Sequence, residues 1–314
     1  MHSFVQTRGR AILVAGCAVV WLALSGIALA GPQAPQGYAG EKTCLTCHEA
    51  QSKGYAGSAH ARVYTANAPA ASQGCESCHG PGQAHAEAGG DVTKIRTFGK
   101  GMKPHEISDA CMTCHAKGEH ALWDGSAHDT RNMSCLSCHS VHEAKSEKAQ
   151  LKKTAETETC VQCHRSQVQK MNKTAHMPVR EGKLQCGSCH NPHGSTNVKL
   201  LKAGNSVNQS CVTCHAEKRG PYLFDHPAVE ESCTSCHDAH GSNNERMLST
   251  RQPYICQRCH VTSNHPPTIY DRSLINASSR YASQNTNKIT GRSCVVCHQT
   301  IHGSNHPGGK AFLR

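Results

Sequence analysis

The chain has few of the side chains that build an ordinary protein core. Aromatic residues make up only 4% of the 314 residues, and hydrophobic residues reach 37% only when the 21 cysteines are counted with them. The length would allow two ordinary domains, but so few large apolar side chains cannot fill two such interiors. We therefore expect something other than side chains to supply most of the apolar interior.

Long hydrophobic runs are also missing after the first 30 residues, so no later segment is predicted to cross a membrane as a helix. Residues 1–30 have the pattern of a cleaved export signal: Arg8 and Arg10 precede an apolar stretch that ends in Ala28-Leu29-Ala30. Cys17 would be removed with this segment. A lipoprotein signal around Cys17 is the alternative, but the apolar run before it is short and continues well past it.

Cysteine, in contrast, is abundant and regularly placed. The pattern Cys-x-x-Cys-His occurs ten times and uses 20 of the 21 cysteines. The cysteines of the ten motifs are Cys44 and Cys47, Cys75 and Cys78, Cys111 and Cys114, Cys135 and Cys138, Cys160 and Cys163, Cys186 and Cys189, Cys211 and Cys214, Cys233 and Cys236, Cys256 and Cys259, and Cys294 and Cys297. The histidines that close them are His48, His79, His115, His139, His164, His190, His215, His237, His260 and His298.

This motif is the attachment signal for c-type haem. Two thiols three residues apart share one face of a helical turn, where they can add to the two vinyl groups of one porphyrin, and the next histidine can ligate the iron. An isolated Cys-x-x-Cys could instead be a zinc site, a redox pair or part of a disulfide scaffold. None of these needs a histidine after every second cysteine. We therefore predict ten covalently bound haem c groups, with the porphyrins as the missing apolar interior.

The positive charge of the chain does not indicate a nucleic-acid partner. The formal net charge is +11, and loss of Arg8 and Arg10 with the signal leaves +9. The two propionates of each haem would outweigh this charge and make the loaded protein acidic. Lysines and arginines are therefore expected to pair with propionates and to keep the protein soluble.

Residues 31–314 repeat as five two-haem modules. Each module has a first motif, a lone histidine, a second motif and a trailing histidine. The lone histidines share a local sequence, as in Gly57-Ser58-Ala59-His60 and Gly125-Ser126-Ala127-His128, and three trailing histidines are followed by Gly-Ser. These histidines are the predicted distal ligands, one for each haem: His60, His85, His128, His142, His176, His193, His226, His240, His265 and His302.

Some residues fall outside this scheme. His105, His120 and His306 have no counterpart in the repeat and are expected to face solvent or propionates. The six methionines after residue 30 are too few and too irregular to serve as axial ligands for ten haems. The segment 267–292 interrupts the fifth module and is either a surface loop or a partner-binding insertion.

Two histidine ligands leave no open position on an iron, so ten such haems predict a conductor of electrons rather than an enzyme. A multihaem oxidoreductase, for nitrite or hydroxylamine, is one alternative, but it needs a haem with a vacant or unusual ligand. A periplasmic electron reservoir without a fixed partner is another.

The sequence resembles the MtrA/DmsE-type periplasmic decahaem cytochromes. The resemblance covers nearly the whole mature chain and rests on the ten-motif layout, on residues 75–82 (CESCHGPG) with His85, and on residues 297–307, which run from Cys297-His298 into His302-Gly303-Ser304. The scarcity of large apolar side chains and the need to wrap ten haems predict an elongated fold of short α-helices and irregular coil round a chain of ten haems, with little or no β-sheet.

The same resemblance implies a place and partners for the protein. The chain would be periplasmic, associated with the outer membrane and seated in or against an outer-membrane β-barrel protein. It would pass electrons between periplasmic electron carriers and an extracellular multihaem cytochrome, a metal oxide or a terminal reductase. The direction of electron flow stays open.

Overall fold

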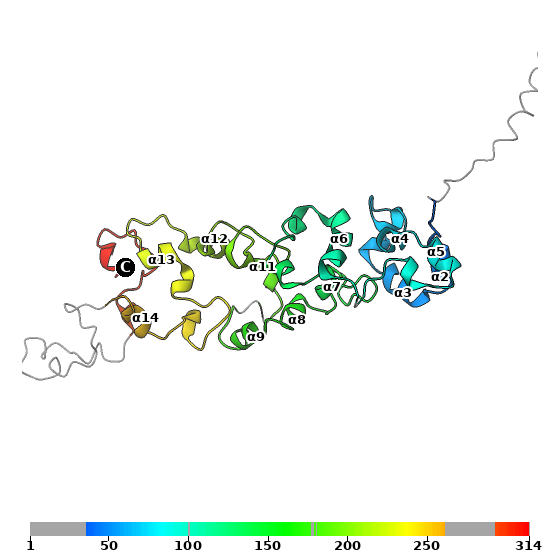
Figure 1. Cartoon of the computed structure of the whole chain (residues 1–314). Helices are drawn as coiled ribbons and strands as arrows, with labels where there is room; N and C mark the ends of the chain where they lie inside the picture. Colours follow the sequence, from blue (N-terminus) through cyan, green and yellow to red (C-terminus); the bar gives the residue numbers. More distant parts are fainter. Residues whose placement is uncertain (1–35, 100, 177–178, 180, 261–292, 314) are drawn as a thin grey trace, which may run out of the picture. The chain divides into compact units, whose positions relative to one another are not determined.

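The computed structural model describes residues 36–99, 101–176, 179, 181–260 and 293–313. The export signal, His265 and the segment 267–292 lie outside the described residues. The described chain consists of short helices joined by coil (Figure 1). The α-helices are α2 (Glu41–Leu45), α3 (Glu49–Ala56), α4 (Glu76–His79), α5 (Gln83–Glu87), α6 (Pro104–His115), α7 (Cys135–Cys138), α8 (Glu156–Cys160), α9 (Arg165–Met171), α11 (Cys186–Cys189), α12 (Val207–Val212), α13 (Pro227–Glu231) and α14 (Tyr254–Gln257).

Short 3₁₀ helices fill many of the connections. They are η1 (Ala59–Ala61), η2 (Pro69–Ala71), η3 (Val92–Lys94), η4 (Gly118–His120), η5 (Asp129–Arg131), η6 (Val198–Leu200), η7 (Ala216–Lys218), η8 (Cys233–Ser235), η9 (Glu245–Met247), η12 (Cys294–Val296) and η13 (Gly309–Ala311). Backbone pairing within the described ranges is limited to five isolated antiparallel β-bridges, with no β-strand. The prediction of short helices, coil and little or no sheet is confirmed.

Eight of the described α-helices include residues of a haem motif: α2, α4, α6, α7, α8, α11, α12 and α14. Helices α7 and α11 consist of the four residues of a Cys-x-x-Cys sequence, so the two thiols of each are one helical turn apart. A serine inside each motif stabilises its turn: the Ser137 hydroxyl accepts the backbone N–H of Ser134, and the Ser188 hydroxyl accepts that of Gln185, both at 3.0 Å. These serines satisfy backbone donors that a helix start leaves without partners.

The chain divides into two compact units, which do not coincide with the five predicted modules. One unit contains Ser72–Arg96 with the described residues up to Cys47; the other contains His48–Ala71 and the residues from Thr97 onward. The five-module organisation therefore stays a prediction from the repeat.

Glu76 holds the first unit together. Its side chain is buried, and its carboxylate accepts backbone N–H groups from Ala39 at 2.8 Å, Gly40 at 2.9 Å and Gly82 at 2.7 Å. Three hydrogen bonds to one carboxylate fasten the chain before the first motif to the loop after the second motif. They also compensate for removing the charge from water.

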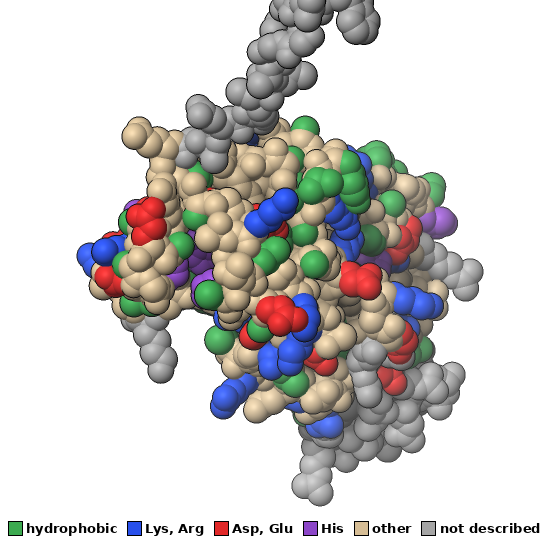
Figure 2. Space-filling model, turned by 90° about the vertical axis from the view of Figure 1, so that its right-hand side faces the viewer, with side chains coloured by type: hydrophobic (Ala, Val, Ile, Leu, Met, Phe, Trp, Pro, Cys, Tyr) green, Lys and Arg blue, Asp and Glu red, His purple; other side chains and the backbone are tan. Residues whose placement is uncertain are grey.

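The second unit buries little apolar surface of its own. Among the described residues, the buried hydrophobic side chains are Tyr55, Ala68, Ile107, Trp123 and Ala175. Figure 2 looks onto the side of the molecule that carries α2, α4 and α5, and on this face too hydrophobic side chains lie scattered between charged ones. None of the described helices is long and apolar enough to cross a bilayer. The described interior contains few apolar side chains, as the composition predicts.

Candidate haem sites

The first cysteines of the two motifs in a module lie in contact. Within the second unit, the Cys111 thiol donates a hydrogen bond to Cys135 and lowers its pKa, and Cys160 does the same to Cys186. The pairs Cys211 with Cys233 and Cys256 with Cys294 are hydrogen-bonded in the same way. In the first unit the direction is reversed, and the Cys75 thiol donates to Cys44. All 20 motif cysteines are described, and none is in a disulfide.

The second cysteines make the connection from one module to the next. Burial raises the pKa of the Cys138 thiol, and the neighbouring Cys163 raises it further. Cys189 has the same relation to Cys214, and the pKa of Cys236 is raised by burial and by Cys259. In the second unit, hydrogen bonds between first cysteines and electrostatic proximity between second cysteines therefore alternate from Cys111 onward. The attachment sites follow one another in sequence order.

One group of side chains resembles a separate metal site. Ligand atoms of Glu156, Cys160 and Cys186 lie within 4.8 Å of one another. Both sulfurs belong to haem motifs, however, and the Glu156 carboxylate accepts the backbone N–H of Gly187. Glu156 thus links the first motif of the third module to the second motif.

Seven predicted distal histidines lie opposite seven motif histidines. An iron between two trans imidazoles, with Fe–N bonds of roughly 2.0 Å, would separate the ring centroids by roughly 6.2 Å. The observed pairs are His60 with His115 (5.9 Å), His128 with His164 (6.2 Å), His176 with His215 (6.4 Å), His226 with His260 (6.0 Å), His193 with His139 (6.1 Å), His240 with His190 (6.1 Å) and His302 with His237 (6.2 Å). This arrangement fits a bis-histidine iron.

Every one of these pairs crosses from one module to the next. A lone histidine lies opposite the first-motif histidine of the following module, as His128 does with His164. A trailing histidine lies opposite the second-motif histidine of the preceding module, as His240 does with His190. The segment with His60 belongs to the second unit because its histidine faces His115 there.

Backbone carbonyls fix the tautomer of many of these imidazoles. The Nδ1 atom of His139 lies 2.6 Å from the Ala149 oxygen, and Nδ1 of His128 lies 2.8 Å from the Pro192 oxygen. A carbonyl oxygen can only accept, so Nδ1 carries the proton and Nε2 keeps the lone pair that a metal needs. The same Nδ1 bond is made by His79, His85, His142, His176, His190, His237 and His298.

Burial keeps seven of the paired histidines in the neutral form that binds iron. Burial, aided by the nearby His120 and His139 rings, lowers the pKa of His193 to about 4. Burial is also the first cause of a lowered pKa in a wider set: His60, His115, His139, His226, His240 and His302. A neutral imidazole offers its lone pair without first losing a proton.

The Gly-Ser sequence after the trailing histidines has a structural reason. Gly194 and Gly241 have φ angles of 124° and 126°, and a Cβ atom at either would collide with a backbone carbonyl, that of Leu122 or of Lys170. The following serine caps the next turn: the Ser242 hydroxyl accepts the Asn244 N–H at 3.0 Å. Glycine thus lets each trailing histidine reach back against the preceding module.

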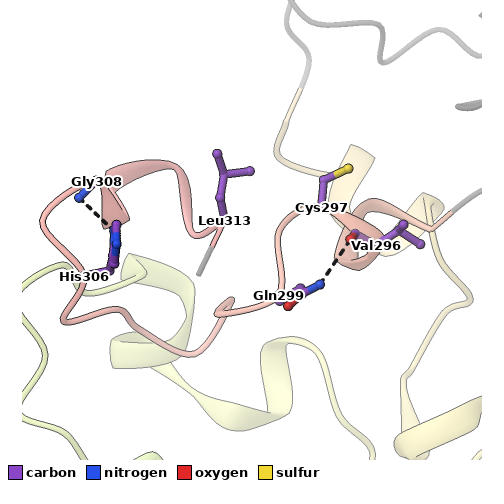
Figure 3. A pocket seen from close by; sticks show the side chains of 6 residues that line it. All are labelled: Val296, Cys297, Gln299, His306, Gly308 and Leu313. Atoms are coloured by element: carbon purple, nitrogen blue, oxygen red, sulfur yellow. Dashed lines mark hydrogen bonds between the residues drawn. The ribbon is translucent and has the colours of Figure 1, made fainter. Parts of the chain in front are cut away.

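The histidines left out of the ligand set differ from the paired ones. His105 is exposed and lies 3.2 Å from the carboxylate of Asp109. The His120 ring is only 4.3 Å from that of His193 and 5.4 Å from that of His115, too close for an iron between trans ligands. His306 lines a cavity of about 460 Å³ beside Cys297, and its Nδ1 accepts the Gly308 N–H at 3.1 Å (Figure 3). In neutral His306 the proton is therefore on Nε2, which suits a donor rather than a ligand.

Repeated thiol pairs and imidazoles spaced for iron define this chain as a multihaem c-type cytochrome. A family model described as "Doubled CXXCH motif" matches residues 176–220 and 226–265, and one described as "Cytochrome c-type protein NrfB-like" matches residues 75–156.

Two curated relatives are similar to this chain, and the first shows its family. The chain is 42% identical over 281 residues to "Multiheme cytochrome MtrA" of Shewanella baltica (strain OS185). The aligned region covers 88% of this chain and 81% of the relative. It is 33% identical over 131 residues to "Cytochrome c-type protein NrfB" of Escherichia coli O6:H1 (strain CFT073), 40% of this chain and 66% of the relative. The chain belongs to the MtrA family. It is an electron-transfer protein with covalently bound haem c, and the sequence resemblance is confirmed.

Proposed function

We propose that the chain binds ten haem c groups, each between two histidines, and conducts electrons along them. When bound, each haem supplies an iron that alternates between the ferric and ferrous states. The observation that carries the proposal is the set of seven imidazole pairs that cross from one module to the next. The remaining motif histidines are His48, His79 and His298, and the distal candidates left for them are His85, His142 and His265.

The alternating cysteine contacts favour a wire over an oxidoreductase or an electron reservoir. They bring each attachment site in the second unit against the next one in sequence, which suits passage of electrons from end to end. A multihaem oxidoreductase would need an iron with a free position. The paired imidazoles support two ligands at each of seven irons, so we propose a carrier rather than an enzyme.

We further propose that the protein works in the periplasm, across the outer membrane and inside a β-barrel partner. The export signal and membership of the MtrA family support this location. Ten haems in near contact, with about 10 Å between irons, would form a row of about 90 Å, longer than the roughly 40–45 Å thickness of a bilayer. Such a row could join periplasmic carriers to an extracellular cytochrome or terminal reductase.

Two measurements on the holo-protein test the proposal. Pyridine haemochrome and mass analysis should find ten haems, and electron paramagnetic resonance should find them all low-spin; one stoichiometric high-spin haem would favour the oxidoreductase. Small-angle scattering should give a radius of gyration of at least about 26 Å, as expected for a rod of that length. A value of about 19 Å, expected for a compact chain of this size, would favour the electron reservoir.

The barrel is tested separately. The protein should enter vesicles together with a β-barrel partner and reduce an oxidant outside when a reduced dye is trapped within. Vesicles with either protein alone should show no transfer. Equal transfer by the cytochrome alone would contradict the need for a barrel.

A further inference from the structure

In three modules, a turn of two non-glycine residues with left-handed backbone follows the second motif. Its two residues are Ala149 and Gln150 (φ 65° and 50°), Lys199 and Leu200 (56° and 58°), and Arg246 and Met247 (55° and 54°). This backbone conformation is unfavourable for any residue with a Cβ atom and persists only where surrounding contacts impose it. Because the same unfavourable conformation recurs at the same place in three modules, we infer that it has a functional role.

Three hydrogen bonds join each turn to the haem motif. The first carbonyl accepts the motif histidine's Nδ1–H, at 2.6 Å for His139, 2.7 Å for His190 and 2.8 Å for His237. The second carbonyl accepts the N–H of the residue after that histidine, as Gln150 does from Ser140 at 2.9 Å. Two residues further along, an N–H returns to the carbonyl of the motif's second cysteine, as Lys152 does to Cys138 at 2.9 Å.

The fifth module has a related arrangement at Ala311 and Phe312, with the second bond to a residue two positions after the motif histidine. The Ala311 carbonyl accepts Nδ1–H from His298 at 2.5 Å, and the Phe312 carbonyl accepts the Thr300 N–H at 3.1 Å. Phe312 is left-handed, with φ 56°. Leu313 then lines the cavity beside Cys297 (Figure 3).

We propose that these four turns, named the proximal clips, position the second-motif histidines and lower the reduction potential of the haems that they ligate. The clips are Ala149–Gln150, Lys199–Leu200, Arg246–Met247 and Ala311–Phe312. The proposal rests on the haem ligation proposed above. An imidazole that donates Nδ1–H to a carbonyl is a stronger donor to iron, and a stronger donor favours the ferric state.

The first motifs supply an internal contrast. In the part of the chain described, Nδ1 of His115, His164 and His215 makes no hydrogen bond to a backbone carbonyl, and His215 instead lies 3.6 Å from the carboxylate of Glu217. The clip therefore belongs to one class of motif. A turn needed only for folding would have no reason to deliver a carbonyl to the same imidazole atom each time.

A matched pair of variants separates tuning from folding. Ala149→Val puts a β-branched side chain where the backbone is left-handed and should open the clip, whereas Ala149→Gly favours the same backbone and should keep it. Both holo-proteins would be compared by haem count and by a redox titration followed with electron paramagnetic resonance. Ala149→Val should retain ten haems, with one low-spin centre shifted to higher potential by about tenfold in its ferrous-to-ferric ratio, or ~59 mV. Ala149→Gly should titrate like the wild type.

The outcomes are distinct. Loss of low-spin ligation at this haem in Ala149→Val alone would also support the clip, as a positioning device. A titration identical to that of the wild type would overturn the proposal. A variant truncated after Lys310 repeats the test at the haem on Cys294 and Cys297. If the proposed haem ligation is itself wrong and His139 is not a ligand, His139→Ala would leave every haem low-spin, which distinguishes that outcome from failure of the clip proposal.

Discussion

Substitution of His128 tests the pairing between modules most directly. The His128 ring lies 6.2 Å from that of His164, and its Nδ1–H bond to Pro192 directs Nε2 away from the backbone. Under the proposed ligation, His128→Ala would remove the distal ligand of the haem on Cys160 and Cys163 and leave its iron five-coordinate. With ten motifs in the chain, about one tenth of the haem iron should become high-spin.

The assay combines spin state with removal of single haems. Electron paramagnetic resonance of oxidised His128→Ala should show a high-spin ferric signal, and added imidazole should restore the low-spin form. Changing Cys160 and Cys163 to Ala in this variant should abolish the high-spin signal, whereas the same change at Cys111 and Cys114 should leave it. The control is His120→Ala, which should keep every haem low-spin.

The ring planes give this prediction a second signature. The imidazoles of His128 and His164 are 74° apart, close to perpendicular, whereas those of His190 and His240 are only 11° apart. Near-perpendicular ligands make two iron d orbitals almost equal in energy, which gives a very anisotropic low-spin signal. His128→Ala should weaken that class of signal. If the high-spin signal instead disappears with the haem on Cys111 and Cys114, the lone histidine serves its own module and the pairing between modules is wrong.

Three further predictions concern the scaffold. Glu76→Ala removes three hydrogen bonds to a carboxylate and should lower the free energy of unfolding of its unit by about 3 kcal/mol in a urea titration, while Glu76→Gln should cost less; equal stability of Glu76→Ala and wild type would contradict the role of the carboxylate. Gly241→Ala should displace His240 and yield a high-spin haem, whereas Gly99→Ala, at a glycine with open space, should not; a fully low-spin Gly241→Ala protein would refute the need for close approach. Protein made without haem should be largely unfolded by circular dichroism, because so few apolar side chains are buried; a native-like helical spectrum would disprove this.

The sequence by itself predicted the cofactor, the attachment residues and the class of protein, and the comparisons confirm haem c and the class. Haem attachment depends on a spacing of a few residues, so the sequence alone reveals it. Cys186, Cys189 and His190, for example, predict one site without any knowledge of the fold. The repeat also selected the histidines that the structure pairs, such as His128 and not His120. Short helices and coil followed from the scarcity of large apolar side chains.

Tertiary structure decided which histidine faces which. His139 and His193 are 54 positions apart, and nothing local to either residue indicates that a trailing histidine reaches back one module. Gly194 makes this possible because its backbone packs against the backbone of Leu122, where a Cβ atom would collide. The proximal clips could not be predicted from the sequence either, because they act through backbone carbonyls, which every residue has. A residue type can signal a side chain's chemistry, but only the folded chain can bring a carbonyl to Nδ1 of His139.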